Sequence, residues 1–119
     1  MLNFIKNLLG LGTPQGYENV SAQTFEKMLA ETPDAVLIDV RSAGEFNGGH
    51  LPKAQNHDIL TGAFQRKVAD LDKDKAYFLY CRSGNRSGMA SKILAKNGFS
   101  KVINMSRGIG SWQGKVVKH

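Results

Sequence analysis

The sequence has little cysteine, little proline and no long apolar run. Its 119 residues include one cysteine, Cys81, so no internal disulfide can form, and metal sites built from thiolates normally need several. The three histidines are spaced too widely for a recognisable metal site; they are His50, His57 and His119. We therefore expect no metal ion and no other cofactor, and Cys81 is either buried filler or a reactive group.

The chain also lacks any block of like charge, although it is basic overall. Sixteen basic residues against ten acidic ones give a net charge of +6, which suits nucleic acid, an anionic membrane or small anions as partners. The lysines are scattered, and no RNA-binding motif with interleaved aromatic residues is present. We therefore expect no nucleic-acid partner. Apolar residues at 41% and charged residues at 22% are typical of soluble globular proteins.

The N-terminal residues 1–16 read as an extension before a single domain over residues 17–119. Four apolar residues recur at near-helical spacing, namely Leu2, Ile5, Leu8 and Leu9. Lys6 interrupts this run, which is too short for a membrane span and lacks the features of a secretory signal. The favoured interpretation is a short amphipathic helix on the domain surface, with weak membrane-surface or partner docking as the alternative. We expect a cytoplasmic protein that does not associate with membranes.

Strands and helices are expected to alternate along the domain. Continuous apolar runs and β-branched residues predict strands over residues 17–20, 35–40, 54–56, 76–80 and 101–104. Helical spacing and capping residues predict helices over 21–33, 42–48, 61–71 and 87–97, the last with Met89, Ile93 and Leu94 on its inner side. This order predicts an α/β fold: a mainly parallel central sheet of about five strands, flanked by helices on both faces.

Cys81 lies directly after a predicted buried strand and directly before a predicted helix. Ligands bind at this carboxyl edge of an open α/β sheet. Successive backbone N–H groups in such a loop can form an anion-binding nest, and the helix N-terminus lowers the pKa of a cysteine placed there. Arg82 and Arg86 add positive charge, Ser83 and Ser87 add hydroxyls, and Gly84 permits backbone angles that a side chain forbids. The loop is suited to ionise a thiol and to attract an anion.

Two chemistries fit a cysteine in such a loop, phosphoryl transfer and sulfur transfer, and both can proceed through a covalent intermediate. Cysteine phosphatases need five residues between cysteine and arginine, because a phosphate with three peripheral oxygens must fit under the loop. Here four residues separate Cys81 from Arg86. The tighter ring suits one outer sulfur atom held on Cys81 as a persulfide.

Four stretches together resemble the rhodanese-homology domain family. They are LIDVR followed by EF (residues 37–41 and 45–46), GHLPKAQN (49–56), YCRSGNRS (80–87) and GIGSW (108–112). The similarity extends from about Tyr17 to Trp112. One departure is that Ile109 separates two glycines that are usually adjacent before the tryptophan, and this puts the local backbone in question rather than the chemistry.

The resemblance implies a rhodanese-like sheet and a nucleophilic cysteine that accepts sulfane sulfur from donors such as thiosulfate. It implies that Cys81 is the persulfide carrier and that Arg82 and Arg86 steer the anionic donor. The N–H cradle, and with it the substrate-binding set, would comprise Arg82, Ser83, Gly84, Asn85, Arg86 and Ser87. With no second cysteine to form a disulfide, the sulfur acceptor must be external: cyanide, a small thiol or the cysteine of a partner protein.

Two alternatives to a small-molecule sulfurtransferase stay open from the sequence. One is a persulfide relay whose true substrate is another protein. The other is a non-catalytic rhodanese-like binding module, against which the intact Cys81 loop argues. A phosphatase or arsenate reductase ranks third.

The remaining motif residues are expected to be structural. Asp39 follows a buried strand and is expected to cap a turn or to pair with a structural arginine rather than to orient an active-site one. Arg41 and Glu45 are expected to form an ion pair. His50 is interpreted as a hydrogen-bonded turn residue, and Trp112 as a packing residue rather than a substrate platform.

Overall fold

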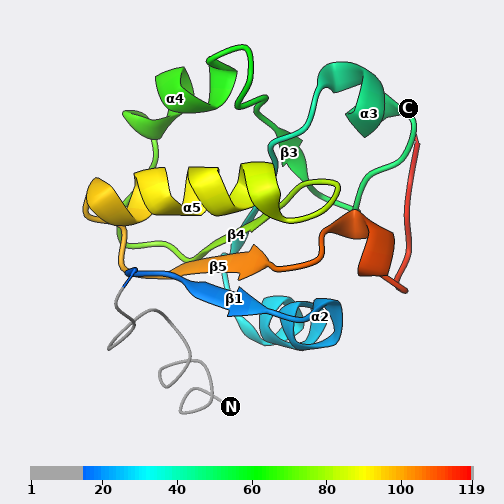
Figure 1. Ribbon diagram of the computed structural model, residues 1–119. Helices are drawn as coiled ribbons and strands as arrows, with labels where there is room; N and C mark the ends of the chain where they lie inside the picture. Colours follow the sequence, from blue (N-terminus) through cyan, green and yellow to red (C-terminus); the bar gives the residue numbers. More distant parts are fainter. Residues whose placement is uncertain (1–14, 119) are drawn as a thin grey trace.

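The central sheet has five parallel strands. The computed structural model describes residues 15–118 of the chain. The strand order is β1-β5-β4-β2-β3, and every neighbouring pair is parallel (Figure 1). The strands are β1 (Glu18–Val20), β2 (Val36–Asp39), β3 (Gln55–Asn56), β4 (Tyr77–Tyr80) and β5 (Val102–Met105). This confirms the fold class expected from the alternation of strands and helices.

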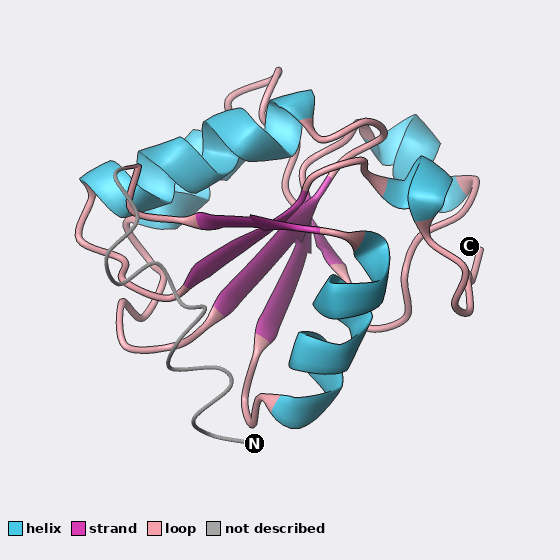
Figure 2. Ribbon diagram, turned by 60° about the horizontal axis from the view of Figure 1, so that its bottom comes forward, coloured by secondary structure: helices cyan, strands magenta, loops and turns pink. Residues whose placement is uncertain are grey.

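Helices cover both faces of the sheet (Figures 1 and 2). They are α2 (Ala22–Glu31), α3 (Ala43–Asn47), α4 (Ala63–Val68) and α5 (Asn85–Lys96), followed by the 3-10 turn η1 (Ile109–Ser111). Phe25 and Met28 of α2 pack on one face. Phe64 of α4 and Leu94 of α5 pack on the other.

The central strand β4 is buried along its whole length because helices cover both faces of the sheet. Along β4, Phe78 points into the core beneath α2, whereas Tyr77 and Leu79 point into the core beneath α4 and α5. Successive side chains of a strand alternate between faces, so a strand covered on both sides reads as a continuous apolar run. This is why continuous apolar runs in the sequence located the strands correctly.

The two predicted serine caps are present. Ser21 caps α2, its hydroxyl accepting a hydrogen bond from the Thr24 N–H at 3.2 Å. Ser42 and Glu45 form a reciprocal capping box at the start of α3. The box fixes the Glu45 carboxylate beside the carboxyl end of β2, which matters for the site described below.

The predicted start of the helix after Cys81, and one of its three predicted inner residues, were wrong. Helix α5 begins at Asn85, two residues before the predicted start. Met89, predicted on the inner side, is 51% exposed, whereas Leu94 is buried and Ile93 packs against the same core, as expected. Two further buried residues of this helix, Ala90 and Ser91, are small, and a search for an apolar stripe does not detect them.

Two other predictions concern helix α4 and the N-terminal residues 1–16. Helix α4 is shorter than the predicted 61–71, because it begins after Gly62 and gives way to turns beyond Val68. The amphipathic helix predicted within residues 1–16 falls largely on residues 1–14, which lie outside the described part of the chain. Within residues 15–118, no helix has both the length and the apolarity needed to cross a membrane.

Candidate active site

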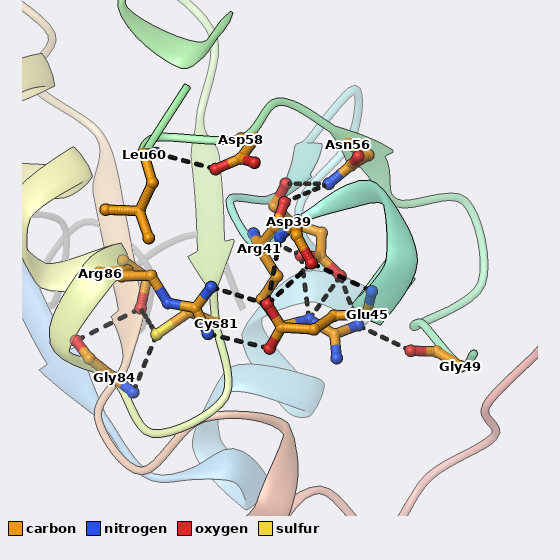
Figure 3. A network of polar contacts seen from close by, with 12 residues as sticks. Asp39, Arg41, Glu45, Gly49, Asn56, Asp58, Leu60, Cys81, Gly84 and Arg86 are labelled. Atoms are coloured by element: carbon orange, nitrogen blue, oxygen red, sulfur yellow. Dashed lines mark hydrogen bonds and ion pairs between the residues drawn. The ribbon is translucent and has the colours of Figure 1, made fainter. Parts of the chain in front are cut away.

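Cys81 lies where the carboxyl ends of the strands meet the N-terminus of α5. It directly follows β4 and is 1% exposed, part of the core beneath α4 and α5. The chain then turns through Gly84, whose φ of 101° is left-handed, and enters α5 at Asn85. This turn folds the loop around the sulfur (Figure 3).

The Cys81 sulfur accepts hydrogen bonds from its own loop. The Gly84 N–H donates to Sγ at 3.1 Å and the Ser87 hydroxyl at 3.4 Å. Burial works to raise the pKa of the Cys81 thiol, but the Ser87 hydroxyl and the backbone N–H groups of Ser87, Ser83 and Gly84 lower it. The net shift is downward, toward the thiolate. A lowered thiol pKa favours the thiolate, which is the nucleophilic form of cysteine.

Two glycines hold the loop against the segment after β5. A Cβ on Gly84 would overlap the carbonyl oxygen of Ser106, and a Cβ on Gly108 would overlap the carbonyl of Arg82. The Ile109 N–H donates to the Cys81 carbonyl at 2.9 Å. The unusual Gly108-Ile109-Gly110 sequence thus forms a short 3-10 turn that contacts the backbone of the cysteine loop.

Arg86, the arginine that closes the loop, is paired with Glu45. Its Nη1 and Nη2 donate to Oε1 and Oε2 of Glu45 at 2.8 and 3.0 Å (Figure 3). The pair lowers the pKa of Glu45 to about 2 and raises that of Arg86. The ion pair predicted between Arg41 and Glu45 was wrong, because spacing along the chain did not reveal that Arg86, 41 residues away, meets the same carboxylate.

Arg41 instead pairs with Asp39, and both side chains are buried. The Arg41 Nη2 lies 2.7 Å from Asp39 Oδ2, and the Arg41 N–H donates to Oδ1 at 2.9 Å. The same Nη2 donates to the Gly49 carbonyl at 2.7 Å, and the Asn56 amide donates to the Arg41 carbonyl at 2.8 Å. Asp39 caps a turn and pairs with a structural arginine, as expected. Together these bonds fix the segment that carries Glu45.

The other predicted site residues divide into exposed and buried groups. Arg82, Ser83 and Asn85 are exposed, while Ser87 is buried. Within residues 15–118 the Arg82 guanidinium makes no hydrogen bond or ion pair. Of the two loop arginines, Arg82 is therefore the one whose charge is not compensated by a described neighbour.

Residues expected to be structural occupy structural positions. His50 is buried, its Nδ1 lies 2.8 Å from the Phe46 carbonyl, and its ring stacks on Phe46 at 3.7 Å. Trp112 packs against the core beneath α2 and meets the ring of Phe25 edge-on at 6.4 Å. In residues 15–118, no three acidic, histidine or cysteine side chains are grouped to hold a metal ion.

One supporting residue was not anticipated from the sequence. Asn104 of β5 is 2% exposed, and its amide donates to Asn19 at 2.8 Å and to the Gly84 carbonyl at 3.5 Å. It supports the loop from the neighbouring strand. Only its unusual polarity within an otherwise apolar strand signals this role.

A parallel α/β sheet with a cysteine in a tight loop at its carboxyl edge is an arrangement suited to ligand binding and to covalent group transfer. The comparison with known families is more specific. The family described as "Rhodanese-like domain" matches residues 21–115. The chain belongs to the rhodanese-like domain family.

Individual relatives agree with this assignment. A protein named "Sulfurtransferase" from Allochromatium vinosum is 30% identical over 93 residues, which cover 78% of this chain and 85% of that protein. The uncharacterised protein YqhL of Bacillus subtilis is 38% identical over 93 residues, covering 78% of this chain and 72% of YqhL. A rhodanese-like domain protein from Staphylococcus aureus has the same fold, with a TM-score of 0.74 at 22% identity over 85% of this chain and 97% of that one.

Proposed function

We propose that this protein is a sulfurtransferase that carries sulfane sulfur as a persulfide on Cys81. It takes the sulfur from a small anionic donor such as thiosulfate and passes it to a thiophilic acceptor. The observation that carries the proposal is the Cys81 sulfur, which accepts hydrogen bonds from Gly84 and Ser87 at the N-terminus of α5. The names of relatives that are sulfurtransferases support the same reading.

In the first half-reaction the Cys81 thiolate attacks the outer sulfur of thiosulfate. A sulfur–sulfur bond forms on Cys81 as the sulfur–sulfur bond of the donor breaks, and sulfite leaves with the bonding electron pair. The cysteine then carries a persulfide anion in place of a thiolate, so no base is required. The N–H groups of Ser83, Gly84 and Ser87 lower the pKa of the thiol, and with the rest of the loop over residues 82–87 they would stabilise this anion in the same way.

In the second half-reaction an acceptor removes the outer sulfur. Cyanide or a thiolate attacks it, a new bond to the acceptor forms, and Cys81 leaves as the thiolate. The chain has one cysteine, so it cannot release the sulfur by forming its own disulfide. The acceptor is therefore external, either a small nucleophile or the cysteine of a partner protein. A cytoplasmic location belongs to the proposal, because a free reactive thiol stays reduced there.

The two loop arginines have different roles in this mechanism. Arg82 is exposed and unpaired among the described residues, and it attracts the anionic donor. Arg86 carries the same formal charge, but Glu45 accepts hydrogen bonds from both of its terminal nitrogens. The bulk of donor steering therefore falls to Arg82.

The proposal is tested by steady-state transfer of sulfur from thiosulfate to cyanide. The wild-type protein should turn over with kinetics in which sulfite leaves before cyanide binds, the pattern of a double displacement. Cys81→Ser, which differs by one atom, should retain the unfolding curve of the wild type and lose turnover by at least about a thousandfold. Equal turnover by the two proteins would refute the proposed role of Cys81.

A further inference from the structure

The Glu45–Arg86 pair lies beside the reactive sulfur, and its charge sums to zero (Figure 3). Both members stay ionised at neutral pH, because the pair holds the pKa of Glu45 near 2 and raises that of Arg86. The Cys81 thiolate is among the charges that raise the pKa of Arg86, after Glu45 itself, so the sulfur and the guanidinium are electrostatically coupled. A charge change in the pair should therefore act on charged reagents that approach the sulfur.

The Glu45 carboxylate is held in position by Ser42 as well as by Arg86. Its Oε1 accepts from the Ser42 N–H at 3.2 Å and from the Ser42 hydroxyl at 3.1 Å. Its own N–H donates back to Ser42, which completes the capping box of α3. The segment leading into α3 is fixed in turn by the buried Asp39–Arg41 pair. The Glu45 carboxylate is thus a fixed negative charge, and the Arg86 guanidinium is positioned against it.

We infer that Glu45 is a positioning residue that acts through Arg86 and sets how strongly the site selects incoming reagents by their charge. By holding and neutralising Arg86, it keeps the site from favouring highly charged donors over singly charged ones. The inference rests on the proposed function in taking Cys81 as the reacting group. It goes beyond that function because it assigns control of donor choice to a residue outside the cysteine loop.

Electrostatics gives the size of the effect. A unit charge a few ångströms from the reagent, in a solvated site, changes the interaction by about fivefold for each unit of charge on the reagent. Glu45→Gln leaves +1 at the pair, Arg86→Gln leaves −1, and the double variant restores zero. Glutamine at position 45 keeps the capping box, which accepts either residue. Charge and structure can therefore be varied separately.

The test compares the alkylation rates of Cys81 by iodoacetate, an anion, and by iodoacetamide, which is neutral. Both reagents need the same thiolate, so the ratio of their rates cancels any change in thiol pKa. We expect the iodoacetate-to-iodoacetamide ratio to rise about fivefold in Glu45→Gln, to fall about fivefold in Arg86→Gln, and to return to the wild-type value in the double variant. The shifts should shrink in high salt, which screens them.

A matched control separates the local pair from net charge. Asp34 is exposed and precedes β2, at the opposite edge of the sheet, and asparagine tolerates its φ of 59°. Asp34→Asn adds the same unit of positive charge as Glu45→Gln and should leave the ratio unchanged. Equal ratios in wild type and both single variants would overturn the inference, as would an equal effect of Asp34→Asn.

A second comparison uses sulfur donors. The ratio of kcat/KM for thiosulfate, a dianion, to that for benzenethiosulfonate, a monoanion, should follow the same order among the four proteins. If no donor reacts while the alkylation ratios follow the charge, the proposed sulfurtransferase function fails and the inference about Glu45 stands. If donors react but neither ratio changes, the function stands and the inference fails.

Discussion

The Cys81 sulfur depends on a small number of hydrogen-bond donors, and one of them is the Ser87 hydroxyl, which also lies 3.4 Å from the Gly84 carbonyl. Ser87 lies in the first turn of α5, and its Oγ lies 3.4 Å from the Cys81 Sγ. Burial alone would raise the pKa of this thiol, and the donors around it reverse that shift. The hydrogen-bond donors around Cys81 therefore determine how readily its thiolate forms.

We predict that Ser87→Ala raises the pKa of Cys81, because the thiolate loses its only hydroxyl donor among the described residues. The rate of alkylation by iodoacetamide, followed against pH, rises as the thiol ionises. In the variant the midpoint of this rise should move to higher pH, and the rate at neutral pH should fall several-fold.

Ser91→Ala is the matched control for this measurement. Ser91 is also buried in α5, one turn further from the sulfur, and its hydroxyl has no hydrogen-bond partner within residues 15–118. Its removal should leave the pH midpoint unchanged. A midpoint that does not move in Ser87→Ala, or that moves equally in Ser91→Ala, contradicts the assigned role of the Ser87 hydroxyl.

At the scale of elements, the cysteine loop is shaped by the segment that follows β5. Gly108 has a φ of 70° and lies against the backbone of Arg82, where a Cβ has no room. The bond from the Ile109 N–H to the Cys81 carbonyl links the two segments. The geometry of the loop thus depends on contacts with the segment after β5 as well as on the loop's own Gly84.

We predict that Gly108→Ala lowers sulfur-transfer kcat by at least about tenfold, because either the cysteine loop or the segment after β5 must shift. The free energy of unfolding should also fall by about 1–3 kcal/mol, given the left-handed backbone. Gly44→Ala is the control, since a Cβ there meets nothing within 4 Å and α3 accepts alanine readily. Retained activity in Gly108→Ala with an unchanged unfolding curve would contradict this account.

The sequence predicted the elements better than it predicted their contacts. Strands buried on both faces and serine caps are local signals, so β2, β4 and the capping box at Ser42 were located correctly. For α5, Ile93 and Leu94 were placed correctly but Met89 was not, because the rest of the inner face is made of small residues, Ser87, Ala90 and Ser91. A local sequence pattern does not show which small residues of a helix pack against the sheet.

The candidate site was likewise predicted only in part from the sequence. The loop around Cys81 and its place before a helix are visible in the sequence. That Glu45 meets Arg86 and not Arg41 depends on the packing of α3 beside the start of α5, across 41 residues of chain. Both Arg41 and Arg86 were available partners by charge. The buried Asp39 decides between them, since it occupies the Arg41 guanidinium.

At the scale of the whole molecule, the parallel sheet brings the ends of β2, β4 and β5 to one edge. The segment that carries Glu45 follows β2, Cys81, the proposed nucleophile, follows β4, and the supporting glycine turn follows β5. Each of these segments alone is short and polar. Their convergence at the N-terminus of α5 makes a site from three separate parts of the chain.

The molecule has one cysteine, which makes the central claim directly measurable. The measurement is the intact mass of the purified protein after treatment with thiosulfate and removal of excess donor. The account predicts a gain of one sulfur atom per chain, lost again on addition of cyanide or a thiol, and no gain in Cys81→Ser. A wild-type mass that stays unchanged with thiosulfate, and with a persulfide donor as well, would contradict it, as would an equal gain in the variant.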